Sequence, residues 1–134
     1  MFRQIMHAKL HRAEVTRADL DYVGSLSVDS DLLEAVGILP YERVLVANIN
    51  NGSRFETYAI EAPAGSGTIG INGAAARLAQ PGDLVLIIAF AYVGENEKVR
   101  PRTAIMGPGN RIEAIMEDEV TVPSDLPEIL GISN

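Results

Sequence analysis

The chain has 134 residues, of which 47% are hydrophobic and 22% are charged, and this balance predicts one soluble globular domain. The formal net charge of −7 argues against a nucleic-acid partner, and the lack of cysteine excludes disulfides and thiolate chemistry. No apolar run is long enough to cross a membrane, and residues 1–7 lack the apolar core of a signal peptide, so we expect a cytoplasmic protein with no membrane partner.

Residues 3–16 are expected to form a strand, because apolar side chains are spaced among polar ones. Lys9 and His11 lie two residues apart and would share one face of that strand. His7 and His11 would be separated by roughly 13 Å at about 3.3 Å per residue. That separation is too large for a shared ion, so the sequence predicts no metal site.

The pair Gly24-Ser25 offers the most distinctive chemistry. A serine hydroxyl can attack the carbonyl carbon of the preceding residue, and a glycine at that position leaves the approach open. If the resulting ester eliminates, the serine becomes dehydroalanine and then a pyruvoyl group, which is a ketone electrophile. Gly-Ser pairs are also ordinary turn residues and occur twice more in this chain, so the pair alone does not decide the function.

A short helix and then a hairpin are expected after this pair. Asp29 or Ser30 can cap the start of the helix, and Gly37 can end it. Asn51-Gly52 is a strong hairpin turn signal between two runs of strand-forming residues.

The second strand of that hairpin, residues 54–60, would carry Arg54 and Tyr58 on one face and Thr57 on the other. The glycine-rich segment that follows it lacks the Gly-Lys-Ser/Thr ending of a phosphate loop. Arg54 can bind a carboxylate with two hydrogen bonds.

Asn72 can cap a short helix whose first backbone N–H groups stay free. The small residues Gly73, Ala74 and Ala75 would let a ligand approach these groups, and such a helix start suits a carboxylate.

The remaining chain predicts further strands. Residues 84–92 are apolar throughout and indicate a strand buried on both faces, and residues 98–106 could form one more. From Gly107 the composition changes, and we interpret residues 107–134 as a peripheral acidic C-terminal tail without chemistry of its own. A mainly β protein with short helices and no repeat indicates a small barrel.

Five segments together resemble the pyruvoyl-dependent aspartate 1-decarboxylases in order and spacing over roughly residues 1–105. They are Lys9-Leu10-His11-Arg12, Tyr22-Val23-Gly24-Ser25, Asn51-Gly52-x-Arg54-Phe55-x-Thr57-Tyr58-Ala59-Ile60, Asn72-Gly73-Ala74-Ala75-Ala76 and Pro81-Gly82-Asp83. Arg77 stands where many members have a histidine.

The resemblance implies a double-psi β-barrel catalytic domain over residues 1–106, assembled as a homotetramer with sites at subunit interfaces. It implies self-cleavage between Gly24 and Ser25, with a covalent pyruvoyl cofactor derived from Ser25 and no metal. The implied reaction converts L-aspartate to β-alanine and carbon dioxide through a Schiff base, for pantothenate and coenzyme A biosynthesis. The pyruvoyl group would accept electrons as pyridoxal phosphate does elsewhere.

The resemblance also implies residue roles. Ser25 and Tyr58 would be catalytic, with Tyr58 returning a proton to the decarboxylated carbon. The substrate-binding residues would be Thr57, Gly73, Ala74, Ala75, Arg54 and Lys9. Asn72 and His11 would support the site.

Two other functions are compatible with parts of the sequence. A noncatalytic β-barrel module could hold an acidic metabolite or peptide at the 72–75 loop and Arg54, with Ser25 unprocessed. A hydrolase using Ser25 and His11 lacks a Gly-x-Ser-x-Gly elbow and an evident acid to orient the histidine. For the decarboxylase, both spontaneous maturation and maturation with a helper protein agree with the sequence.

Overall fold

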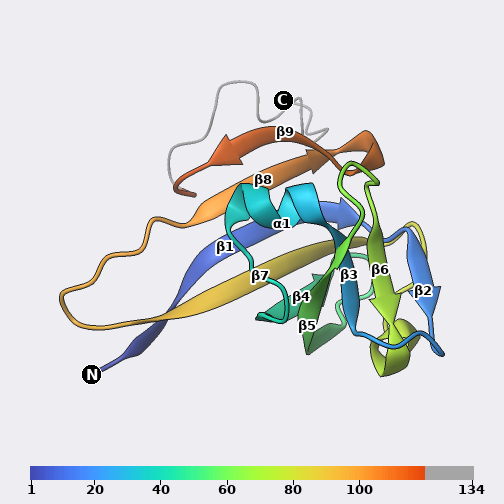
Figure 1. The fold of residues 1–134 in the computed structure, drawn as a ribbon, viewed down its shortest axis with the longest axis horizontal. Helices are drawn as coiled ribbons and strands as arrows, with labels where there is room; N and C mark the ends of the chain where they lie inside the picture. The colour runs from blue at the N-terminus through green and yellow to red at the C-terminus, as the bar shows by residue number, and fades with distance from the viewer. Residues whose placement is uncertain (120–134) are drawn as a thin grey trace.

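The computed structural model describes residues 1–119, which are built on one mixed nine-stranded sheet (Figure 1). The strands are β1 (Arg3–Glu14), β2 (Arg17–Asp19), β3 (Leu26–Asp29), β4 (Arg43–Asn48), β5 (Arg54–Ala62), β6 (Ile69–Asn72), β7 (Leu84–Val93), β8 (Arg102–Gly107) and β9 (Arg111–Met116). The helix is α1 (Ser30–Val36), and two 3₁₀ turns are η1 (Gly73–Arg77) and η2 (Pro108–Asn110). The predicted mainly β class with short helices, a double-psi β-barrel, is confirmed.

The hydrogen-bonded order of the strands is β2-β6-β3-β5-β4-β7-β1-β8-β9. Hairpin-type antiparallel pairs join β4 to β5 and β8 to β9. Three pairs are parallel, namely β1 with β8, β2 with β6, and β3 with β5. Parallel strands need a crossover, so distant parts of the chain meet at these pairs.

Helix α1 has the caps that its sequence predicts. The Asp29 carboxylate accepts the Asp31 N–H at 2.9 Å, and Gly37 ends the helix in the left-handed conformation with its N–H donating to the Leu33 carbonyl oxygen. The helix contacts β3 and β5 from one half of the sheet and β1 and β8 from the other. It therefore packs across strands from both halves of the sheet (Figure 1).

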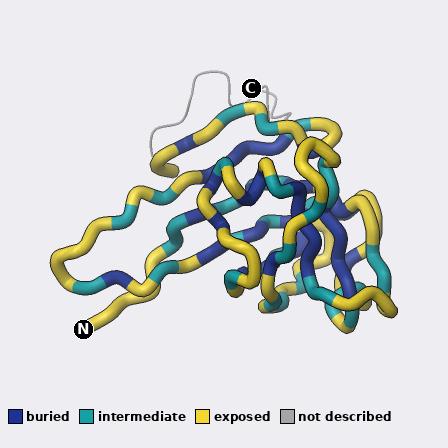
Figure 2. The backbone as a smooth tube through the Cα atoms, in the orientation of Figure 1, coloured by how far each residue is buried: buried dark blue, intermediate teal, exposed yellow. Residues whose placement is uncertain are grey.

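The core runs along the inner faces of the strands (Figure 2). In β7, Val85, Ile87 and Ala89 are fully buried, whereas Phe90 and Tyr92 are exposed. The prediction that residues 84–92 are buried on both faces is therefore wrong. One face of this apolar strand packs in the core, and the other lies on the surface of the folded chain. No helix within residues 1–119 has the length and apolar character needed to cross a membrane.

The expected domain boundary after Met106 falls inside β8. Strand β9 pairs with β8, and Asn110 between them is buried against Glu14 and Gly67. Residues 107–116 thus belong to the sheet, since the glycine-proline break is a turn within it. The division into a catalytic domain and a peripheral tail stays a prediction. More than half of the predicted tail, residues 120–134, lies outside the described residues.

Candidate active site

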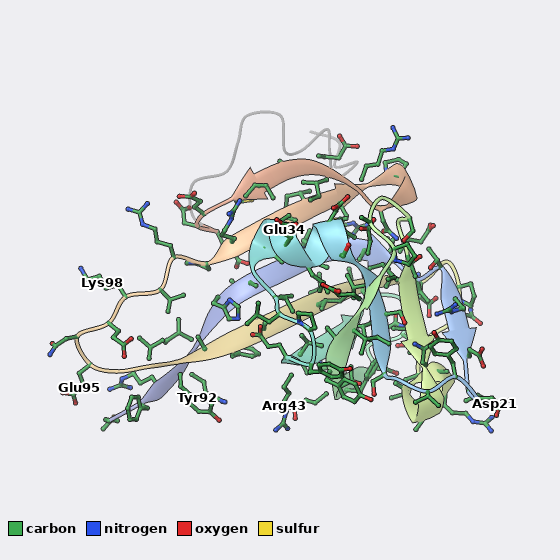
Figure 3. The ribbon with its side chains drawn as sticks, in the orientation of Figure 1. Asp21, Glu34, Arg43, Tyr92, Glu95 and Lys98 are labelled. Carbon is green, nitrogen blue, oxygen red and sulfur yellow. The ribbon has the colours of Figure 1, made fainter. Side chains whose placement is uncertain are left out.

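Gly24 and Ser25 form a half-buried bend immediately before β3. The bend follows the loop that contains Asp21, which is labelled in Figure 3. Gly24 has a φ of 110°, and a Cβ added to it would lie 2.7 Å from Cδ1 of Ile60. The Ile60 side chain could shift to relieve that contact, but the backbone conformation favours glycine, so the carbonyl that Ser25 would attack is held in a conformation that other residues rarely adopt.

The strand register brings Ser25 beside two other predicted site residues. Leu26 pairs with Ala59 in the parallel β3–β5 ladder, so one step back along both strands places Ser25 level with Tyr58. On the other side, the N–H of Asn72 donates to the Ser25 carbonyl oxygen over 2.8 Å. Ser25 is therefore flanked by β5 and by the end of β6.

Asn72 is 1% exposed and occupies the N-cap position of η1, as predicted. Its side chain makes no capping hydrogen bond, so that part of the prediction is wrong; Nδ2 instead donates to the Ser27 hydroxyl at 2.9 Å. The extended register of β6 against β3 directs the side chain to Ser27. Within residues 1–119, the Asn72 Oδ1 has no hydrogen-bond partner, which is unusual for a buried acceptor.

The small residues Gly73, Ala74 and Ala75 follow directly and form the start of η1. Gly73 has a φ of 66°, and no atom lies within 4 Å of a Cβ built on it. Ala74 is exposed and Ala75 is partly exposed. The structure therefore places a short segment of small residues next to the Ser25 bend, with open space beside Gly73.

Strand β5 presents its predicted faces, with Arg54 and Tyr58 exposed on one side and Thr57 less exposed on the other. The Cα atoms of Arg54 and Tyr58 are separated by roughly 13 Å, since four residues of a strand rise about 3.3 Å each. Arg54 pairs with Ala47 at the far end of the β4–β5 ladder and has no ion pair within residues 1–119. The strand therefore offers a free cation and a phenol on one face.

Lys9 and His11 are not brought next to Ser25 by strand pairing, because β5, β4 and β7 lie between β3 and β1 in the sheet. The Lys9 ammonium donates to Oε1 of Glu119 at 3.1 Å, with 15% of its side chain exposed. Burial lowers the pKa of His11, the charges of Lys9 and Arg12 lower it further, and Glu119 acts in the opposite direction. His11 is therefore neutral at neutral pH.

Residues 1–113 match the family model described as aspartate decarboxylase. The chain belongs to the aspartate decarboxylase family. A relative from Geobacillus sp. (strain WCH70), named aspartate 1-decarboxylase, is 52% identical over 122 residues, which cover 89% of this chain and 95% of the relative. Proteins of the same name from Desulfotalea psychrophila and Maricaulis maris are 52% identical over 87% of this chain and 57% identical over 82% of it; the aligned parts cover 100% and 93% of those relatives.

In this member of the aspartate decarboxylase family, sequence reasoning missed two neighbours of the site. The ring of Tyr41 stacks on that of Tyr58, with centroids 6.1 Å apart and an interplanar angle of 27°. The Ser27 hydroxyl holds the Asn72 amide. The sequence around Pro40 signals only a turn, and Ser27 is one polar residue in a short strand, so neither carried a signal for a site.

Residues 1–119 contain no group of three or more metal-ligating side chains. Of the predicted site residues, the structure gathers Ser25, Tyr58 and Asn72, with η1 beside them. Thr57 adjoins Tyr58 on the opposite face of β5. Arg54 lies at the far end of β5, and Lys9 and His11 lie on β1, which β5, β4 and β7 separate from β3.

Proposed function

We propose that this chain decarboxylates L-aspartate to β-alanine and carbon dioxide with a pyruvoyl cofactor formed from Ser25. The observation that carries the proposal is the register that sets Ser25 beside Tyr58, immediately after a glycine with a φ of 110°. Membership of the aspartate decarboxylase family, and relatives named aspartate 1-decarboxylase, support the reaction. The product serves pantothenate and coenzyme A synthesis.

Maturation begins with attack of the Ser25 hydroxyl oxygen on the Gly24 carbonyl carbon. The acyl group moves from nitrogen to oxygen, and elimination then releases Gly24 as a carboxylate and leaves dehydroalanine. Addition of water and loss of ammonia convert this residue to the pyruvoyl group. The hydrogen bond from the Asn72 N–H to the Ser25 carbonyl oxygen keeps the attacking residue in register with β6 during these steps.

A pyruvoyl group at position 25 would supply a ketone for the substrate amine and would accept electrons when carbon dioxide is lost. The exposed Arg54 guanidinium binds a substrate carboxylate with charge-assisted hydrogen bonds, against the overall negative charge of the chain. The rest of the substrate is contacted by the backbone of Gly73, Ala74 and Ala75 and by the Thr57 side chain. Lys9 already binds Glu119, and that carboxylate would compete with a substrate carboxylate for its charge.

Tyr58 delivers the proton that replaces the lost carboxylate. It lies level with Ser25 and is 38% exposed, so its hydroxyl can reach a substrate attached there. A phenol hydroxyl is a donor that can pass its proton to a strongly basic carbon.

The site is expected to be completed between subunits of a homotetramer. Arg54 and Tyr58 are separated by roughly 13 Å along β5, and three strands lie between β3 and the strand that carries Lys9 and His11. A second chain could bring such residues against the Ser25 bend. The exposed large hydrophobic residues Leu39, Tyr41 and Tyr92 offer apolar surface for such contacts. A helper for maturation and a cytoplasmic location stay predictions.

Mass spectrometry under denaturing conditions, combined with an assay of β-alanine, tests the proposal. The purified protein should give fragments 1–24 and 25–134, and the larger fragment should be lighter by one ammonia than the product of simple hydrolysis. Ser25→Ala is the matched control and should stay whole and inactive. An intact parent chain that still binds aspartate would favour a noncatalytic module, and normal turnover by Ser25→Ala would contradict the pyruvoyl mechanism.

A further inference from the structure

The turn that connects α1 to β4 places an aromatic ring against Tyr58. The Tyr41 and Tyr58 rings stack with centroids 6.1 Å apart and an angle of 27° between their planes. Tyr41 is 77% exposed and Tyr58 is 38% exposed. Because burial in the core does not hold either ring, the contact between them limits where the Tyr58 phenol can point.

The backbone of Tyr41 has a strained conformation. Tyr41 has a φ of 69°, a conformation that glycine and asparagine adopt readily and that a bulky aromatic residue rarely does. Such strained positions gather at functional sites, where the surrounding structure enforces them. Glycine or asparagine would adopt this φ with less strain, so the backbone of the turn does not explain why a tyrosine occupies the position.

Hydrogen bonds on both sides enforce the position of this turn. The Tyr41 N–H donates to the Ala59 carbonyl oxygen at 2.7 Å, and the Ala59 N–H donates to the Glu42 carbonyl oxygen at 3.1 Å. Both bonds are made to the residue directly after Tyr58. The Glu42 carboxylate also accepts the Leu39 N–H at 3.0 Å and contacts Nε2 of His7 at 2.6 Å, which closes the turn and ties it to β1.

We propose that Tyr41 is a positioning residue for Tyr58, and this rests on the proposed function of Tyr58 as proton donor. The stacked Tyr41 ring restricts rotation of the Tyr58 side chain and keeps its hydroxyl directed toward the substrate carbon at Ser25. Stacked aromatic pairs stabilise an arrangement by an amount that corresponds to roughly 2- to 12-fold in rate. The effect should appear in kcat, since Tyr41 holds the proton donor and not the substrate.

Two substitutions separate the ring from the backbone strain, and both should be measured on fully processed protein. Tyr41→Phe keeps the ring and should retain the parental kcat. Tyr41→Asn tolerates the positive φ but lacks the ring, so kcat for β-alanine formation should fall roughly 2- to 12-fold with KM nearly unchanged. The same variant should be no less stable to urea than the parent. A purely structural role would instead lower stability and activity together.

A double-mutant cycle with Tyr58→Phe provides the decisive comparison. When the phenol proton is absent, Tyr41→Asn should cause no further loss of kcat. Light scattering should give the same assembly state for all variants. Parental kcat in Tyr41→Asn, or an equal loss in the Tyr58→Phe background, would overturn the role of Tyr41 while leaving the decarboxylase function intact. Unchanged kcat in Tyr58→Phe alone would instead exclude Tyr58 as the proton donor, and a positioning role for Tyr41 would then have no basis.

Discussion

Asn110 provides a quantitative test of how the last described strand is joined to the rest of the sheet. Its Oδ1 accepts the Glu14 N–H at 2.7 Å, and its Nδ2 donates to the carbonyl oxygens of Glu14 and Gly67, both at 2.8 Å. Asn110→Ala removes three hydrogen bonds worth about 1 kcal/mol each. The residue is 4% exposed, so water cannot easily replace them. We expect the free energy of unfolding to fall by about 3 kcal/mol.

Urea unfolding followed by circular dichroism measures this loss, with Ser25→Ala as background so that the chain stays continuous. With an m value of about 2 kcal/mol/M, the midpoint should fall by about 1.5 M. Asn110 has a φ of 56°, so Asn110→Gly is the matched variant that lacks the same bonds without the backbone strain. Alanine should therefore cost more than glycine. A loss below about 0.5 kcal/mol in Asn110→Ala, at unchanged m, would refute the reasoning, because it falls below the contribution of a single such bond.

Four further predictions concern the site. Gly24→Ala should slow self-cleavage roughly 5- to 150-fold, because a strained φ costs about 1–3 kcal/mol; mass spectrometry over time would detect it, and parental kinetics would contradict it. Tyr58→Phe should still cleave but form β-alanine about 10²- to 10⁴-fold more slowly. Arg54→Ala should lower kcat/KM for aspartate roughly 10- to 150-fold, and an unchanged value in processed protein would exclude the role. Glu119→Gln should lower KM roughly 2- to 5-fold by freeing Lys9; a higher KM would speak against competition.

Local signals predicted the elements that local chemistry determines. The caps at Asp29 and Gly37 and the Asn51-Gly52 turn gave α1 and the β4–β5 hairpin, together with the faces of β5. The burial of residues 84–92 was mispredicted, because an apolar run does not reveal which face another element covers.

The juxtaposition at the site depends on pairing between segments far apart in the sequence. Strands β2, β3 and β6 are only three or four residues long, too short for a periodic pattern, and their parallel partners are distant. The Gly-Ser pair indicated Ser25 and the family resemblance indicated Tyr58 as candidates, and neither predicted that the two are level with each other. Likewise, the glycine-proline break signalled a turn, and only the pairing of β9 with β8 shows that the sheet continues beyond it.

The position of β1 has a consequence for folding after maturation. This strand lies inside the sheet between β7 and β8, yet it belongs to the part of the chain before the proposed cleavage point. The precursor folds as one molecule, with a rate independent of concentration. The cleaved protein, once denatured, would have to recover β1 from a separate peptide in a second-order reaction that becomes slower on dilution. The matured protein would thus regain its structure poorly once its two pieces had separated.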